Sequence, residues 1–345
     1  MMVMSNLQIG LALCGLVLVA LIALQGAWSS RKNLPRQATK SDEPLPPSSD
    51  IDPELDAAAF DVANFPVPVL DKKSSLDALI DSMASITPEG EVSGDAALAA
   101  MPATRRAGSK PLAIEGYNQS LQRWEKPVAG QRYLDFQAGV QLANRSGGLN
   151  EIEYSEFVIK TQAFCDSINA TPEFPEMSEE VARARELDQF AADHDAQLGF
   201  VLRSNNTAWS PGYVQQNAAR LGFVAGAIPG RMVIPSHAPG LPAVLSLSFD
   251  AQAALAEDLD LSAIWEVAIS FDVPQVDRTE QAFARMRDAM QTLAEQMDGE
   301  VTDDNGVKVT REAMDAIAVD LEHLYDTLDQ RDLSAGSPLA RRLFS

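Results

Sequence analysis

Few side chains in this sequence stand at the spacings that catalysis or metal binding requires. Asp303 and Asp304 are neighbouring carboxylates that could hold a cation, but Asn305-Gly306 follows them and favours a turn. The three histidines form no metal-ligand motif with each other or with a cysteine. They are His194, His237 and His323. The sequence therefore predicts no catalytic residue, no metal site and no cofactor.

Composition narrows the function classes further. The glycine-rich run GFVAGAIPG at 222–230 has no lysine and no helix start after it, so we read it as strand bends rather than a phosphate cradle. A net charge of −22 and a pI near 4.4 disfavour nucleic-acid binding. The two cysteines, Cys14 and Cys165, indicate no disulfide framework. We expect a protein that is not an enzyme. An enzyme that uses Asp303 and Asp304 with a metal is a further hypothesis, ranked after the two binding functions given below.

The N-terminus predicts a membrane anchor. Residues 7–28 form an apolar run long enough to cross a bilayer as a helix of about 33 Å. Four basic residues stand between this run and the first acidic residue, Asp42, whereas no basic residue stands before the run. They are Arg31, Lys32, Arg36 and Lys40. The positive-inside rule then predicts an uncleaved single-pass helix, with residues 1–6 outside and the rest of the chain in the cytoplasm.

Composition after the anchor predicts a tether. Residues 29–125 are rich in acid and proline and show no sustained periodicity, so we expect a disordered linker. Two stretches within it, 75–86 and 95–101, favour short local helices. At the other end of the chain, residues 331–345 are expected to be a flexible tail.

Order is expected from residue 126 onward. Residues 126–195 predict a β-α-α extension, with a strand in RYLDFQAGVQLAN followed by two amphipathic helices. Residues 196–330 predict strands and helices in the order β-α-β-β-β-α-β-α. Ser210-Pro211 begins the first of these helices and Gly222 ends it. Adjacent alternating strands favour an α+β fold, mostly antiparallel, with helices on one face of the sheet.

The order and spacing of several segments resemble the ZipA family of bacterial division proteins, which tether FtsZ to the inner membrane. The telling pieces are LGF at 198–200, PAVLSLSF, AISFDVP before the long helix, and GEVTDDNG before a helix that starts at Thr310. The resemblance covers about residues 197–326. It implies a split β-α-β fold and a non-enzymatic role, in which an exposed sheet face binds the C-terminal tail of FtsZ as a helix.

Carried onto this sequence, the resemblance and the strand alternation give an expected partner-binding face. The heavier side chains of each strand are expected in the core, and a one-residue slip would expose Phe249 and Ile269 instead. The expected contact residues are Gly199, Val201, Ile228, Ser248, Ala268 and Ser270. Only Val201 and Ile228 among them are large and apolar.

The sequence thus predicts an inner-membrane protein of the division septum whose partners are the FtsZ tail, the lipid bilayer and, in addition, other division proteins. The alternative is a division or envelope scaffold that binds another protein and has lost direct FtsZ binding. Residues 133–195 lie outside the resemblance, and we hypothesise that their two helices pack near or upon the sheet and modify or cover the partner face.

Overall fold

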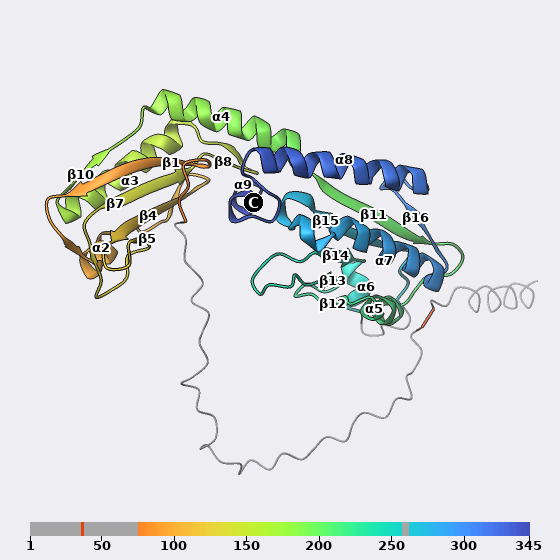
Figure 1. Ribbon diagram of the computed structural model, residues 1–345. Coiled ribbons are helices and arrows are strands. Elements are labelled where there is room, and N and C mark those ends of the chain that lie inside the picture. Colours follow the sequence, from red (N-terminus) through yellow and green to blue (C-terminus); the bar gives the residue numbers. More distant parts are fainter. Residues whose placement is uncertain (1–35, 38–74, 257–261) are drawn as a thin grey trace, which may run out of the picture. The chain divides into compact units, whose positions relative to one another are not determined.

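The computed structural model describes residues 36–37, 75–256 and 262–345 (Figure 1). The chain divides into two compact units, which we describe separately. The 196–326 unit consists of those residues together with Arg36 and Gln37. The 75–195 unit consists of those residues together with 327–345. The expected anchor and, apart from Arg36 and Gln37, residues 29–74 of the expected linker lie outside the described residues. No helix within the described ranges is long and apolar enough to cross a membrane.

The 196–326 unit contains an antiparallel sheet in the order β12-β13-β14-β15-β11-β16. Its strands are β11 (Gln197–Ser204), β12 (Val224–Ala225), β13 (Arg231–Ile234), β14 (Leu245–Ser248), β15 (Glu266–Asp272) and β16 (Gly299–Thr302). The first strand of the unit, β11, lies between β15 and β16. This strand, second from one edge of the sheet, therefore pairs with the last strand of the unit.

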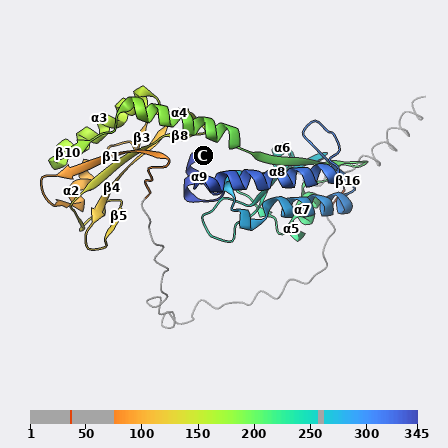
Figure 2. The same cartoon turned by 45° about the horizontal axis from the view of Figure 1, so that its top comes forward.

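Helices follow the strands of the 196–326 unit at the positions that local sequence signals favour. They are α5 (Pro211–Arg220), α6 (Ala251–Ala254), α7 (Ala282–Met297) and α8 (Arg311–Gln330), with short 3₁₀ turns at Val273–Gln275 and Arg278–Glu280. Ser210 Oγ caps α5 by accepting from the N–H of Tyr213, and Gly222 follows the helix at φ +88°. Helix α7 packs against β11, β15 and β16, and α5 packs against α7 (Figures 1 and 2).

Strand register in this unit follows the expected alternation. The β15 side chains Val267, Ile269 and Phe271 are buried, whereas Ala268 and Ser270 between them are half-buried. Because heavy apolar side chains gain most from leaving water, they select the face covered by α7. The one-residue slip does not occur.

The 75–195 unit is a second antiparallel sheet, in the order β10-β1-β7-β4-β3, with β5 paired to β4. Its strands are β1 (Asp81–Pro88), β3 (Arg106–Ala107), β4 (Lys110–Asn118), β5 (Arg123–Glu125), β7 (Phe136–Gln141) and β10 (Ala170–Glu173). Two small pairs accompany the sheet: β2 (Val92–Ser93) with β6 (Arg132–Tyr133), and β8 (Ala143–Asn144) with β9 (Gly147–Gly148).

The helices of the 75–195 unit are α2 (Gly94–Ala100), α3 (Glu151–Ile168), α4 (Met177–His194) and α9 (Pro338–Leu343). Asn150 begins α3 with a capping box: its side chain accepts from the N–H of Glu153, whose carboxylate accepts from the N–H of Asn150. Helix α3 packs on β1, β7 and β10, and α2 packs on α3 (Figures 1 and 2).

The mixture of helices and antiparallel sheets confirms the α+β prediction. Two of the expected segments are wrong. Residues 75–125, assigned to the linker, hold β1 and β4, and the second half of the expected helix at 75–86 is strand β1. The cause is non-local pairing: Ile86 pairs with Phe136 and with Pro172, both far along the chain. The tail is also ordered, since α9 buries Leu343 and Phe344.

Candidate functional site

Strand pairing brings five of the six expected contact residues onto one sheet face. Gly199 lies opposite Ser270, Val201 opposite Ala268, and Ala268 also opposite Ser248. Residues directly opposite each other in an antiparallel pair point to the same side. We call this side the outer face, defined by Gly199, Val201, Ser246, Ser248, Ala268 and Ser270. It is the side turned away from α7, because the buried residues of β15 alternate with it.

The sixth residue, Ile228, lies beside the outer face rather than in a strand. The run at 222–230, read as strand bends, instead belongs to a hairpin in which β12 pairs with β13. Gly230, at φ +75°, makes the reversal, and the N–H of Arg231 donates to the carbonyl of Ile228. The turn leaves the Ile228 side chain 56% exposed.

A groove of about 480 Å³ follows the outer face toward this hairpin. Its lining includes Gln197, Ile228, Arg231, Val233, Ser246 and Ser270. The groove therefore joins the exposed Ile228 to Ser246 and Ser270 of the outer face, and the other four residues of that face lie beyond its lining.

The outer face carries mostly small side chains, with Val201 as its one large apolar residue. A Cβ added at Gly199 would lie 3.2 Å from the Cβ of Ser270, so even alanine would press on the neighbouring strand. At the borders of the face, Arg203 pairs with Glu266 at 3.4 Å, and Arg231 donates to Ser246 at 3.3 Å. Such a surface can accept a complementary apolar side chain, but it offers no nucleophile beside a base.

Sequence reasoning missed the contribution of β13 to this surface. Arg231 lies opposite Ser248, and Val233 lies opposite Ser246. The missed signal was the alternation in RMVI, where Met232 is buried and its two neighbours point the other way. The Pro229-Gly230 pair, read as a bend, marks the turn that begins this strand.

The apolar stripes of α3 and α4 are buried within their own unit. Phe157 and Phe164 of α3 are fully buried, and α3 contacts β1, β7 and β10. Helix α4 contacts α3, β8 and β9, and buries Val181. The sequence hypothesis has these helices pack near or upon the sheet and modify or cover the partner face. The structure buries their apolar stripes within their own unit instead, so the stripes do not require the partner face.

Arg36 makes a specific contact with the 196–326 unit. Its N–H donates to the carbonyl of Ala208 at 2.7 Å, and its carbonyl accepts from the N–H of Ser210 at 2.9 Å. This forms a parallel bridge at Trp209, a fully buried side chain. The guanidinium pairs with Asp298 at 3.0 Å. Hydrogen bonds from Asn205 and Asn206, and then Arg36, lower the pKa of the Asp298 carboxyl.

Asp303 and His237, two of the residues considered for chemistry, have structural partners. Asp303 Oδ1 accepts from the N–H groups of Asn305 and Val307 at 2.9 and 2.8 Å, as in a turn. His237 Nδ1 lies 2.7 Å from Glu280 Oε2. Within the described ranges, no group of three or more His, Cys, Asp or Glu side chains is placed to hold a metal ion.

A larger groove of about 680 Å³ lies between α7 and the segment that connects β16 to α8. Met290 and Met314 contribute to its lining, and charged residues form its rim. Several of these charges are paired: Arg287 with Asp315 at 2.7 Å, and Lys308 with Glu300 at 2.6 Å. We place the candidate site at the outer face, where the strand register gathers the expected residues.

A comparison with protein families identifies part of the 196–326 unit. Residues 255–319 match the family described as ZipA, C-terminal FtsZ-binding domain. The matched stretch contains β15, α7 and β16 and enters α8. The resemblance seen in the sequence is thus confirmed over this stretch, and the matched family is a binding domain. No curated protein sequence matches the chain.

Proposed function

We propose that this protein is a membrane-anchored division protein that binds the C-terminal tail of FtsZ through the outer face of its 196–326 unit. The observation that carries the proposal is the match of residues 255–319 to an FtsZ-binding domain. That stretch supplies β15, whose Ala268 and Ser270 stand in the middle of the outer face. The proposal also assigns the split β-α-β fold of that family to the 196–326 unit.

The proposed recognition uses apolar anchors, not ionic ones. A helical FtsZ tail would lie over the strands and bury Ile228 at one border of the groove. Affinity in such helix-in-groove complexes comes from a few buried side chains. Ile228 is the most exposed large apolar side chain at this border, so it is the anchor we assign on the protein side.

The proposed anchor is the apolar run at 7–28, which places the protein at the inner membrane of the division site. Arg36 supports a short connection from this run to the binding unit, because it pairs with Ala208 and Ser210. Arg36 follows Trp28 by about eight residues, which can span at most about 28 Å. The FtsZ-binding unit would then stay close to the bilayer.

One observation favours a second candidate function, a division scaffold that does not bind FtsZ directly. The outer face consists mostly of glycine, alanine and serine, and only Val201 and Ile228 of the expected contacts are large and apolar. A face that buries little apolar area supplies little binding free energy. The candidate partner would then be another protein of the division assembly.

Binding to FtsZ distinguishes the two candidates. The full chain, reconstituted in lipid nanodiscs, is sedimented with FtsZ polymers and titrated with a fluorescent peptide of the FtsZ tail. The proposal predicts co-pelleting above a polymer-free control and saturable peptide binding. Absence of both, with the chain folded, would refute direct FtsZ binding and leave the scaffold function.

A further inference from the structure

The two units repeat one topology. In the 75–195 unit the elements run β1, α2, β3, β4, β7, α3, β10, α4. In the 196–326 unit they run β11, α5, β13, β14, β15, α7, β16, α8. The spatial orders correspond as well: β10-β1-β7-β4-β3 in one sheet matches β16-β11-β15-β14-β13 in the other. The remaining elements, such as β5 and α6, are additions to this common plan.

Strand register repeats together with the topology. The last residue of β1, Pro88, pairs with the first residue of β10, Ala170. The last residue of β11, Ser204, pairs in the same way with the first residue of β16, Gly299. Since register can slip independently in each sheet, its agreement is more specific than the strand order.

The long helices end identically in the two units. Asn169 after α3 has φ 52° and ψ 58°, and its N–H donates to the carbonyl of Cys165. Asp298 after α7 has φ 55° and ψ 58°, and its N–H donates to the carbonyl of Ala294. In each case the edge strand begins at the next residue. A left-handed residue other than glycine is uncommon, so its recurrence at the same point is informative.

Counted back from these caps, the buried positions of the two helices also coincide. Positions 157, 161, 164 and 168 of α3 are buried, and so are the corresponding positions 286, 290, 293 and 297 of α7. Both helices contact the edge strand of their sheet and the two strands next to it. The residues differ, so the common feature is the fold rather than a sequence motif.

We infer that the 75–195 unit is a second copy of the fold of the 196–326 unit, and that the corresponding sheet face of this copy is a docking site filled in cis by the chain's own segment Ser75–Leu79. The register identifies the corresponding positions. Gly139 corresponds to Ser270, Glu115 to Ser248, Asp81 to Gln197 and Gln141 to Asp272. On the 196–326 unit, this end of the face is the open groove.

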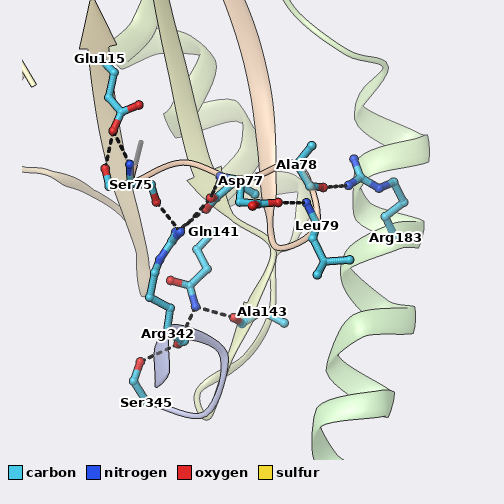
Figure 3. Close-up of polar contacts among 11 residues, drawn as sticks. Ser75, Asp77, Ala78, Leu79, Glu115, Gln141, Ala143, Arg183, Arg342 and Ser345 are labelled. Atoms are coloured by element: carbon cyan, nitrogen blue, oxygen red, sulfur yellow. Dashed lines mark hydrogen bonds and ion pairs between the residues drawn. The ribbon is translucent and has the colours of Figure 1, made fainter. Parts of the chain in front are cut away.

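Leu76 occupies the face of the second copy. Its side chain is only 6% exposed, and a Cβ added at Gly139 would lie 2.6 Å from Leu76 Cδ2. The glycine therefore makes room for the leucine. Beside it, the N–H and the hydroxyl of Ser75 both donate to Glu115 Oε1 at 2.6 Å (Figure 3). Gln137 donates to the other oxygen of this buried carboxylate at 2.9 Å.

Arg342 of α9 also holds the segment in place. Its guanidinium pairs with Asp81 at 2.5 Å and donates to the carbonyl of Ser75 at 2.6 Å. Gln141 donates to the carbonyl of Arg342 at 2.8 Å (Figure 3). The Asp81 side chain is fully buried, and this burial raises its pKa although the Arg342 contacts oppose the rise. A buried carboxylate that lost its cation would be strongly destabilising, so the pair ties the two ends of this unit together.

These contacts define what the second face accepts. The occupant presents a leucine to Gly139, an N–H and a hydroxyl to Glu115, and a carbonyl to Arg342. The 196–326 unit has Ser270 where the second copy has Gly139, and Ser248 where it has Glu115. The two faces therefore select different segments, and the second face takes a segment of this chain.

The test uses the full chain and a fluorescein-labelled synthetic peptide with the sequence of residues 71–80, DKKSSLDALI. In the wild type, the tethered segment competes at a local concentration near the millimolar range, so added peptide binds poorly. The Leu76→Ala variant loses the anchor that the peptide still carries. It is expected to bind one peptide per chain, at least about tenfold more tightly than the wild type does.

Two further variants locate the binding. Adding Gly139→Val to Leu76→Ala fills the leucine position and is expected to abolish peptide binding. Adding Ser270→Val instead alters the corresponding position of the 196–326 unit and is expected to leave binding unchanged. Equal binding by the wild type and Leu76→Ala, no binding by folded Leu76→Ala, or loss of binding with Ser270→Val would each overturn the inference.

Amide hydrogen exchange of the wild type provides a measurement that does not depend on any variant. The N–H of Ser75 donates to Glu115 and the N–H of Asp77 donates to Asp81 at 2.8 Å. Both amides are expected to exchange slowly because they are bonded on a filled face. Exchange of both at the rate of an unstructured chain would overturn the inference even if Leu76→Ala fails to fold. No FtsZ is used, so the result is independent of the proposed function.

Discussion

Replacing Ile228 by alanine tests the proposed docking face most directly. The side chain stands at the tip of the β12–β13 hairpin and is 56% exposed, so it contributes little to folding. A partner that fills the groove beside it would cover that exposed part. We expect Ile228→Ala to weaken binding of the FtsZ tail while leaving stability nearly unchanged.

The magnitude follows from the exposed fraction. Full burial of an isoleucine side chain is worth about 1.5–3 kcal/mol, and somewhat more than half of this side chain is still available to a partner. Covering it gives about 1–1.5 kcal/mol, and alanine retains only a small part of that contribution. Since about 1.4 kcal/mol corresponds to a tenfold change, the expected loss is roughly five- to tenfold in Kd.

Fluorescence anisotropy of a labelled FtsZ tail peptide, titrated with the full chain, measures this change. The matched control is Val319→Ala on α8, because Val319 is 57% exposed and does not line the groove. Thermal unfolding of both variants checks that neither has lost structure. If the Kd of Ile228→Ala is within twofold of the wild-type value, the peptide does not dock at this border of the groove. The same conclusion follows if Val319→Ala weakens binding as much as Ile228→Ala does.

Three other predictions concern the stability and reactivity of the fold. The Glu280 side chain is nearly buried. Burial raises the pKa of its carboxyl, but hydrogen bonds from His237 and Ser236 outweigh this effect and lower the pKa. The ionised carboxylate therefore stabilises the fold above the usual glutamate pKa, and this contribution is lost as pH falls through the lowered value. Glu280→Gln should therefore lower the denaturant-derived free energy of unfolding at pH 6 by about 1.5–3 kcal/mol and by clearly less at pH 3; an equal loss at both pH values would contradict this. Burial raises the pKa of Cys165 to about 11, so mass spectrometry should find this thiol unalkylated at pH 8 until denaturant is added, and rapid native alkylation would count against the fold. Asn150→Ala removes the capping box of α3 and should cost about 1 kcal/mol by chemical denaturation, whereas Gln162→Ala, in the exposed middle of the same helix, should cost little.

Local sequence signals were enough for most of the 196–326 unit. Ser210 and Pro211 begin α5 where expected, and Thr310 accepts from an N–H in the first turn of α8. The alternation of heavy and light residues in β14 and β15 selected the correct face of the sheet. These signals act within a few residues, so they are readable without knowing the fold.

The residues of the outer face were predictable only in part. Gly199, Ser248, Ala268 and Ser270 stand where the alternation put them, because strands on both sides kept the expected register. Ile228 was assigned to a strand but lies in a turn. Whether a Pro-Gly pair bends a strand or reverses it depends on whether the flanking segments find each other, and β12 and β13 do.

What the sequence determined by itself is the set of local elements: the helices with their caps, the alternating strands, and the segment at 255–319 that identifies an FtsZ-binding domain family. What only the tertiary structure decided is that residues 75–125 and 331–345 are ordered parts of a folded unit. Short strands such as β3 and β5 have too few residues to fold alone, and become stable only through partners distant in the chain. Leu76, Asp81 and Arg342 become one cluster for the same reason, since no sequence pattern brings positions so far apart together.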